Sequence, residues 1–241
     1  MCIDLPSILE SEGFCTIDRY LDNQTIRMLT ASFESLDEGH DAVTECDTSA
    51  RRKRGVVFAR RNLLSSPFVR QLIVSEPAVS LVDQISTGSI AIRAILFDKT
   101  GNANWTVPWH QDRSIAVAEK INVPGFGPWS EKAGVTHVQP PVSLLQEMFT
   151  LRFSLDECGP DNGPLRVIHA THRKILAPAE IETSVRGGLE SNCMTAAGGV
   201  VIIRPLILHA SSPANSASHR RILHVEFGPP SLPGGLRWAM A

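Results

Sequence analysis

The chain lacks several features that mark particular classes of protein. None of its apolar runs approaches the roughly 20 residues needed to cross a bilayer. Its opening segment, MCIDLPSILESEG, carries acidic residues where a secretory signal has a basic stretch and an apolar core. No internal repeat or low-complexity tract interrupts its 241 residues. These absences predict a protein of the cytoplasm with no membrane partner.

Paired cysteines and a dominant charge are missing as well. The five cysteines are scattered and form no CxxC pair, which favours reduced thiols over a disulfide framework or a zinc cluster. Lys and Arg number 23 and Asp and Glu 25, a formal charge of -2. The chain as a whole therefore has no electrostatic attraction to nucleic acid. We expect a small molecule as its partner, and the sequence leaves the oligomeric state open.

One strongly basic run, RRKRGVVFARR at residues 51–61, stands out from this balance. Phe58 is its only aromatic residue, whereas single-stranded nucleic-acid sites interleave several stacking platforms with their charges. A solvated loop face is therefore the preferred interpretation. A nucleic-acid patch and a contact with an acidic substrate are the alternatives.

The residues that are present predict a helical first part. A helix is expected to begin at Asp22 or Asn23, because either residue can cap it and apolar residues follow at helical spacing. Two shorter helices are expected at 66–73 and 76–86, each with a proline near its first turn. The character of the sequence changes near residue 88.

Short β-rich runs separated by Gly, Pro, Asn and Asp make up the remainder. Strands are expected at 89–98, 106–112, 114–118, 147–156, 164–170, 198–210 and 220–227. Because no long helices separate them, they predict a sandwich or barrel, not a parallel sheet with crossovers. We expect one domain spanning residues 1–241, with a helical flank (1–88) packed on a β core (89–241).

The stretch VPWHQDRSIAV, residues 107–117, contains the first candidate chemistry. Residues i and i+2 of a strand project from one face, so His110 and Asp112 would offer an imidazole and a carboxylate to one ion. His209, at the end of the apolar run VVIIRPLILHA, is the candidate third ligand. Two histidines and one carboxylate leave three positions open on the metal, as in non-haem Fe(II) oxygenases. The alternative is a surface histidine beside an aspartate that caps a turn.

Arg220 decides between these interpretations. It opens the run RRILHVEF, eleven residues after His209. A guanidinium stays charged and binds a carboxylate through two parallel hydrogen bonds, which suits the far end of a chelating 2-oxo acid. Alternation along a strand lets only Arg220 or Arg221 face inward. An exterior salt bridge is the other interpretation for either arginine.

Four blocks of the sequence carry a family resemblance: LFDKTGNANWTVPWHQDRSIAV, VPGFGPWSEKAGVTHVQPP, FTLRFSLDECGPDNGPLRVI and RPLILHASSPANSASHRRILHVEFGP. In these blocks, over most of its length, the chain resembles the phytanoyl-CoA dioxygenase family of Fe(II)/2-oxoglutarate-dependent oxygenases. The resemblance implies a mainly β, double-stranded β-helix core of the jelly-roll, cupin-like type with an N-terminal helical flank. It also implies iron bound by His110, Asp112 and His209 and 2-oxoglutarate bound by Arg220, Gln111 and Ser211.

Two further residues have open interpretations. Where family members commonly have RVIPGSH, this chain has RVIHATH, so that His169 replaces a proline. We interpret His169 as a turn histidine with satisfied hydrogen bonds, and a position facing the substrate as the alternative. Trp129, in GFGPWSEK, is interpreted as a packing residue, with a position over the active site as the alternative.

The predicted activity is that of a non-haem Fe(II)/2-oxoglutarate-dependent dioxygenase that uses O2, with ascorbate as a candidate reductant. It would oxidise an unactivated C–H bond of a small molecule, such as an amino acid or a natural-product intermediate, and release succinate and CO2. Hydroxylation is the expected outcome, and desaturation or oxidative cyclisation at the same site are alternatives. Asp112 disfavours halogenation, because a halide ligand needs the room that a smaller residue leaves. A cupin-like metalloenzyme without 2-oxoglutarate and a non-catalytic binding protein are the remaining alternatives.

Overall fold

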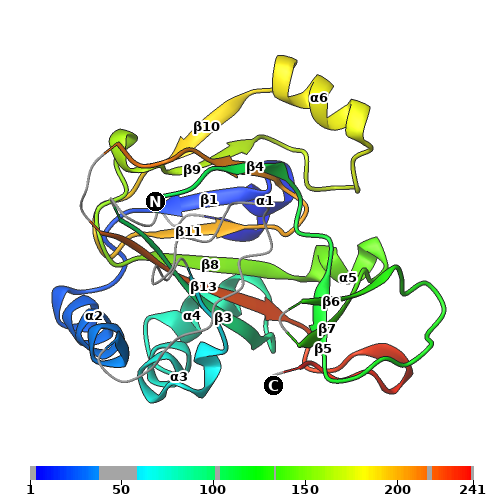
Figure 1. The fold of residues 1–241 in the computed structure, drawn as a ribbon, viewed down its shortest axis with the longest axis horizontal. Helices are drawn as coiled ribbons and strands as arrows, with labels where there is room; N and C mark the ends of the chain where they lie inside the picture. Colours follow the sequence, from blue (N-terminus) through cyan, green and yellow to red (C-terminus); the bar gives the residue numbers. More distant parts are fainter. Residues whose placement is uncertain (1–3, 38–58, 101–103, 133, 216–218, 240–241) are drawn as a thin grey trace.

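Three antiparallel sheets form the framework of the protein (Figure 1). The computed structural model describes residues 4–37, 59–100, 104–132, 134–215 and 219–239. The largest sheet runs in the order β1 (Phe14–Ile17), β11 (Val200–Ile203), β8 (Phe149–Ser154), β13 (Arg220–Gly228), β3 (Ile90–Lys99) and β2 (Ala59–Arg60). The second sheet runs β10 (Glu190–Cys193), β9 (Leu165–Ile168), β12 (Leu208–Ser211) and β4 (Val107–His110). A small third sheet contains β5 (Ile115–Val117), β7 (Val135–Val138) and β6 (Trp129–Lys132).

The helices frame these sheets. They are α1 (Leu5–Ser11), α2 (Asn23–Asp37), α3 (Pro67–Val74), α4 (Ala78–Ile85), α5 (Val142–Glu147) and α6 (Pro178–Gly187). Asp22 caps α2, because its carboxylate accepts a hydrogen bond of 2.7 Å from the Thr25 N–H. No helix in the described ranges is long and apolar enough to cross a membrane.

The largest sheet has one apolar and one polar face. Leu223, Val225 and Phe227 of β13 are buried in an apolar cluster that also contains residues of α1, α2, α3 and α4. The residues between them, among them His224 and Glu226, project to the opposite face, because side chains alternate along a strand. The helices therefore cover one face of the sheet, and the second sheet faces the other.

This mainly β, jelly-roll arrangement confirms the predicted fold class. The flank also contributes strands that the sequence did not predict, since β1 pairs with β11 and β2 pairs with β3. The three expected helices of the flank are present as α2, α3 and α4. The free thiols Cys15, Cys158 and Cys193 are buried, as expected for reduced cysteines, and the other two cysteines lie outside the described residues.

Two strand predictions are wrong in detail. The expected strand 198–210 is divided into β11 and β12 by a turn around Pro205, in which the Ile207 N–H bonds the Arg204 carbonyl at 3.1 Å. Strand β4 ends at His110, so Asp112 does not share a strand with it. Proline explains the first difference, since it has no N–H to donate to a sheet ladder.

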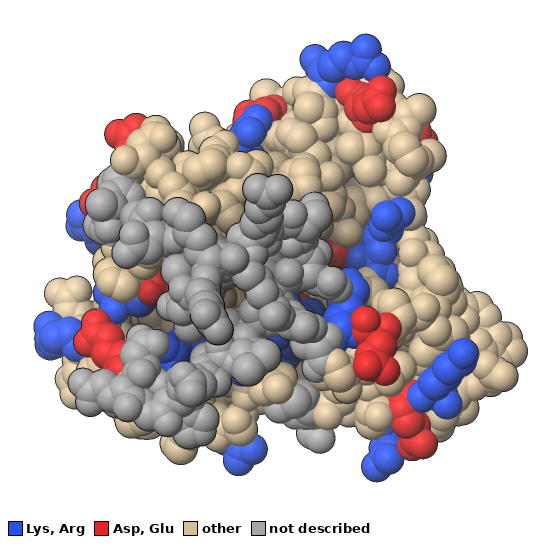
Figure 2. Space-filling view, viewed as in Figure 1, with Lys and Arg blue, Asp and Glu red and all other residues tan. Residues whose placement is uncertain are grey.

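The surface of one face carries both signs of charge. Figure 2 shows basic and acidic side chains interspersed over the described part of this face. This pattern agrees with the near balance of acidic and basic residues in the sequence. Residues 51–58 of the basic run lie outside the described residues, while Arg60 belongs to β2.

Candidate active site

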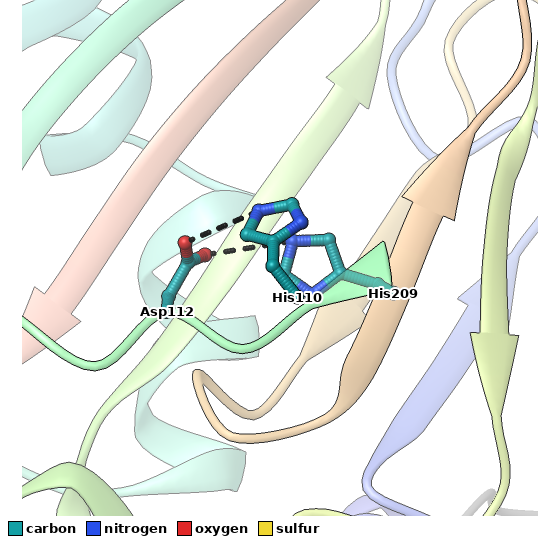
Figure 3. A group of neighbouring side chains, drawn as sticks. All are labelled: His110, Asp112 and His209. Atoms are coloured by element: carbon teal, nitrogen blue, oxygen red, sulfur yellow. Dashed lines mark ion pairs between the residues drawn. The ribbon is translucent and has the colours of Figure 1, made fainter. Parts of the chain in front are cut away.

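Strand pairing brings together the three predicted metal ligands. His110 of β4 and His209 of β12 are direct partners across the antiparallel pair. Asp112 follows β4 and is fixed by its backbone N–H, which donates to the Pro205 carbonyl at 2.9 Å. One ligand atom from each of the three residues lies within 4.8 Å of the others. Figure 3 shows both imidazoles turned toward the carboxylate, so one ion can contact all three.

Backbone carbonyls orient both imidazoles. The Nδ1 atom of His110 lies 2.8 Å from the Pro108 carbonyl oxygen, and that of His209 lies 2.8 Å from the Ile207 carbonyl oxygen. A carbonyl only accepts, so Nδ1 carries the proton and the unprotonated Nε2 is free to bind a metal. The Nε2 atoms are each 3.7 Å from a different oxygen of Asp112. Such outer contacts are typical of histidines that bind metals.

Burial and neighbouring groups shift the pKa values of His209 and Asp112. Burial lowers the pKa of His209 to about 4, which keeps the imidazole neutral. Burial opposes ionisation of Asp112, but attraction of the carboxylate to the surrounding imidazole rings and to the Arg93 guanidinium outweighs it and holds the pKa of the carboxyl below its usual value. A neutral imidazole and an ionised carboxylate are the forms that bind a divalent cation.

Arg220 and Arg221 point in opposite directions. Arg220 is 2% exposed and lines a cavity of about 320 Å³ that the metal ligands also line. Its Nε atom is buried and has no hydrogen-bond partner among the described residues. Arg221 points away from the cavity and forms a two-pronged contact with Asp156, at 2.8 and 2.7 Å. The structure thus places Arg220, and not Arg221, where a ligand can reach it.

Lys99 is a cavity residue that the sequence analysis missed. It pairs with Arg220 across β3 and β13 and is fully buried. Its Nζ donates to the Ser211 hydroxyl at 3.0 Å and to the Ser212 carbonyl at 2.6 Å. Burial, and secondarily Arg220, lowers the pKa of the ammonium to about 7. Ser211 also lines the cavity, so these three residues form one polar end of it.

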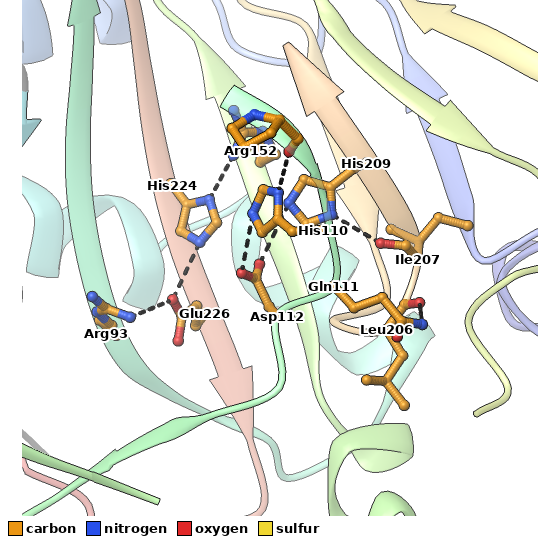
Figure 4. Close-up of polar contacts among 11 residues, drawn as sticks. Arg93, His110, Gln111, Asp112, Arg152, Leu206, Ile207, His209, His224 and Glu226 are labelled. Carbon is orange, nitrogen blue, oxygen red and sulfur yellow. Dashed lines mark hydrogen bonds and ion pairs between the residues drawn. The ribbon is translucent and has the colours of Figure 1, made fainter. Parts of the chain in front are cut away.

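The floor of the cavity holds further charged residues that were not predicted. Strands β3, β8 and β13 turn Arg93, Arg152, His224 and Glu226 toward the metal ligands (Figure 4). Once Arg220 is taken as inward, alternation along RRILHVEF also turns His224 and Glu226 inward, so this signal was available in the sequence. The positions of Arg93 and Arg152 depend on pairing between distant strands.

The structure does not bring Gln111 to the cavity. Its amide nitrogen donates to the carbonyls of Leu206 at 2.6 Å and Lys174 at 2.9 Å, and its amide oxygen accepts from the Leu176 N–H at 2.8 Å. These partners lie in the segments beside β12 and α6. The buried Gln111 side chain therefore ties the metal-binding segment to the surrounding loops.

His169 and Trp129 follow their preferred interpretations. The two ring nitrogens of His169 contact a Glu12 carboxylate oxygen at 2.7 Å and the Ser191 hydroxyl at 2.8 Å. Trp129 begins β6 and packs against an apolar cluster, with the Lys120 ammonium 5.7 Å from the centre of its ring. Neither residue is among those that line the cavity.

A family model described as phytanoyl-CoA dioxygenase (PhyH) matches residues 9–222. The chain belongs to this family. As a member, it is a non-haem iron, 2-oxoglutarate-dependent enzyme, which agrees with the metal-binding group in the cavity. No curated protein sequence matches the chain.

Solved structures share the fold of this PhyH-family chain. AviO1 from Streptomyces viridochromogenes Tue57 is 24% identical, with 94% of each chain covered and a TM-score of 0.68. SnoN, an alpha ketoglutarate dependent epimerase from nogalamycin biosynthesis, is 14% identical, with 96% of this chain and 89% of SnoN covered and a TM-score of 0.69. EctD from S. alaskensis in its apoform is 12% identical, with 95% of this chain and 77% of EctD covered and a TM-score of 0.73.

Replacing His209 by Ala tests the metal centre. Two ligands then remain, so Fe(II) binding measured anaerobically by calorimetry should be lost. His219→Ala is the control, because that imidazole is exposed and pairs with Asp98 at 2.7 Å outside the cavity. Wild-type affinity in His209→Ala, with a melting temperature that shows a folded protein, would contradict the ligand assignment.

Gln111→Ala tests the role of the buried amide. The change leaves buried backbone groups without partners, and we expect the free energy of unfolding to fall by about 1–3 kcal/mol for a group left unsatisfied. The control is Gln146→Ala, which removes an exposed contact with the Arg173 carbonyl and should change stability by less than about 0.5 kcal/mol. Urea denaturation measures both. Unchanged stability in Gln111→Ala, together with weaker 2-oxoglutarate binding, would contradict this structural role and would support the contact with 2-oxoglutarate that the family resemblance implies.

Proposed function

We propose that this protein hydroxylates an unactivated C–H bond of a small molecule, coupled to conversion of 2-oxoglutarate and O2 into succinate and CO2. His110, Asp112 and His209 would hold the iron, and Arg220, Lys99 and Ser211 would hold the far carboxylate of 2-oxoglutarate. The observation that carries the proposal is that both groups line one cavity. Gln111 is left out of the cosubstrate site, because its amide is bonded to backbone groups elsewhere.

The donor set fits iron. Two imidazole nitrogens and one carboxylate suit Fe(II), and all three ligands come from one side, which leaves positions for cosubstrate and oxygen. Both histidines are held by backbone carbonyls, so the site is preorganised. Asp112 occupies the position that a halide needs, which supports oxygenation over halogenation.

The polar end of the cavity fits a carboxylate. The Arg220 guanidinium is buried with an unpartnered Nε, and the Lys99 ammonium is buried beside it. Among the described residues, neither cation has a carboxylate within 4.0 Å. Burying unpaired cations is costly, so an anionic ligand relieves that cost. A cupin-like metalloenzyme that does not use 2-oxoglutarate has no need of this pair.

Iron and 2-oxoglutarate, when bound, supply the oxidising chemistry. The protein's own residues set the geometry: the triad fixes the metal, and Arg220 and Lys99 fix the cosubstrate at the far end. The apolar residues Ile95, Phe97, Leu145 and Met148 also line the cavity and limit the access of water to the reacting bond. Ascorbate is expected to act only as a reductant that keeps iron as Fe(II).

The same site is compatible with other oxidative outcomes. The similar structures include SnoN, named as an epimerase, and SnoK, named as a carbocyclase. Both are described as alpha ketoglutarate dependent, so one fold supports several reactions. Desaturation or oxidative cyclisation therefore stays the second candidate for this chain. Product analysis by mass spectrometry separates them, because hydroxylation adds an oxygen atom and desaturation removes two hydrogens.

Anaerobic titration of the Fe(II) protein with 2-oxoglutarate, followed by the charge-transfer absorption of the complex, tests the cosubstrate site. We expect Arg220→Gln to weaken binding about 10- to 100-fold, because it removes charge-assisted hydrogen bonds of ~1.5–3 kcal/mol. The matched control is Arg221→Gln, in which the lost arginine faces Asp156, and its affinity should equal that of wild type. Equal effects of the two substitutions would contradict the assignment.

The pH dependence of 2-oxoglutarate binding tests Lys99. Its pKa of about 7 means that the ammonium is present below pH 7 and is lost as the pH rises. Binding should therefore weaken above pH 7, by at most about tenfold per pH unit, and should take up a proton at pH 8. Calorimetry in two buffers of different ionisation enthalpy measures this uptake. Lys99→Met should abolish it; the same proton uptake in that variant would show that another group titrates.

A further inference from the structure

Arg152 lies on the cavity floor beside the metal ligands. It projects from β8 opposite His224 of β13 and lines the cavity. Its Nη1 donates to the Nδ1 of His224 at 2.8 Å, and its guanidinium carbon lies 5.9 Å from the centre of the Phe97 ring. Figure 4 shows Arg152 and His224 next to the His110–Asp112 pair.

No carboxylate of the described residues forms an ion pair with Arg152 within 4.0 Å, and Asp112 acts on its charge only from a greater distance. Both carboxylates that line the cavity have other roles. Asp112 lies between the two imidazoles, and Glu226 accepts from Arg93 at 3.2 Å. His224 brings no charge, because its Nδ1 accepts from the guanidinium and its proton therefore sits on Nε2, which donates to Glu226 at 3.3 Å.

The environment makes this positive charge costly. Burial, and secondarily Arg220, lowers the pKa of Arg152 to about 10, far below that of an arginine in water. A cation that is removed from water without an anion loses more solvation than neutral hydrogen bonds return. The site therefore favours a ligand that brings negative charge to the floor.

The far carboxylate of 2-oxoglutarate is assigned to Arg220 and Lys99, whose backbones lie apart from that of Arg152. His224 is four residues beyond Arg220 on β13, a separation of about 14 Å at ~3.4 Å per residue. Since Arg152 is directly opposite His224, its backbone is anchored well away from the Arg220–Lys99 pair. Arg61 and Lys132 also line the cavity, so its lining is richer in positive charge than the mixed outer surface.

We propose that the substrate carries a carboxylate or phosphate group, which Arg152 binds beside the metal centre. This inference rests on the proposed function, because the metal and the cosubstrate define which space is left for the substrate. A guanidinium binds either anion through two parallel hydrogen bonds, so the shared chemistry is a group with two or more anionic oxygens. Arg152 would select such substrates and position them for attack.

The test uses the full protein with Mn(II) in place of Fe(II) and saturating 2-oxoglutarate, and inorganic phosphate as the probe. Calorimetry at constant ionic strength should show phosphate binding to this complex, and Arg152→Gln should weaken it at least about tenfold. Arg152→Gln should change 2-oxoglutarate affinity less than about threefold. Arg237→Gln is the control, because it removes an exposed arginine outside the cavity. Arg152→Lys keeps the charge and should retain part of the binding if Arg152→Gln fails to fold.

Two results would overturn the inference. If the saturated wild type takes up no phosphate and Arg152→Gln weakens 2-oxoglutarate about tenfold, then Arg152 binds the cosubstrate's metal-side carboxylate. If phosphate binds equally to wild type and Arg152→Gln, the anion site lies elsewhere. A wild-type protein that binds no 2-oxoglutarate at all would overturn the proposed function. This outcome is distinguishable from the two phosphate-binding results above.

Discussion

The alternation of side chains along β3, β8 and β13 is the constraint on which the rest of the protein depends. One face of these strands must be apolar, because it packs against the helices of the N-terminal flank. The other face is then free to carry polar groups, and it presents Lys99, Arg152 and Arg220 to the cavity. A shift of one residue in the register of any of these strands would move a charged side chain among the helices and an apolar core side chain into the cavity. The same strand register therefore determines both the packing of the core and the positions of the site residues.

Burial gives the cavity its chemical character. It lowers the pKa of Lys99 to about 7 and that of Arg152 to about 10, and it favours neutral His209. Charged groups in such a place are costly unless ligands compensate them. In the proposed function, the negative charge of the cosubstrate compensates the cations Arg220 and Lys99. The positive charge of the divalent metal compensates the Asp112 carboxylate between the two histidines. Neither ligand is assigned to Arg152, and we infer that this guanidinium binds the substrate.

The sequence predicts some of this arrangement well. The metal triad was predicted because HxD, an apolar strand ending in histidine, and a nearby arginine are local signals, and because the family blocks occur in order. The details beyond it depend on distances in space. Lys99 meets Arg220 only through the register of β3 against β13, and Asp112 reaches the histidines through the Pro205 carbonyl and not through a shared strand. Gln111 could not be placed, because its partners come from two segments far apart in the sequence, the β9–α6 connection and the β11–β12 turn.

The most direct test of the central claim is a crystal structure of the protein grown anaerobically with Fe(II) and 2-oxoglutarate. The account predicts one metal ion bound to His110, Asp112 and His209, and the far carboxylate of 2-oxoglutarate on Arg220 and Lys99, with Arg152 in contact with neither ligand. Metal bound elsewhere, or the far carboxylate placed on Arg152, would contradict it.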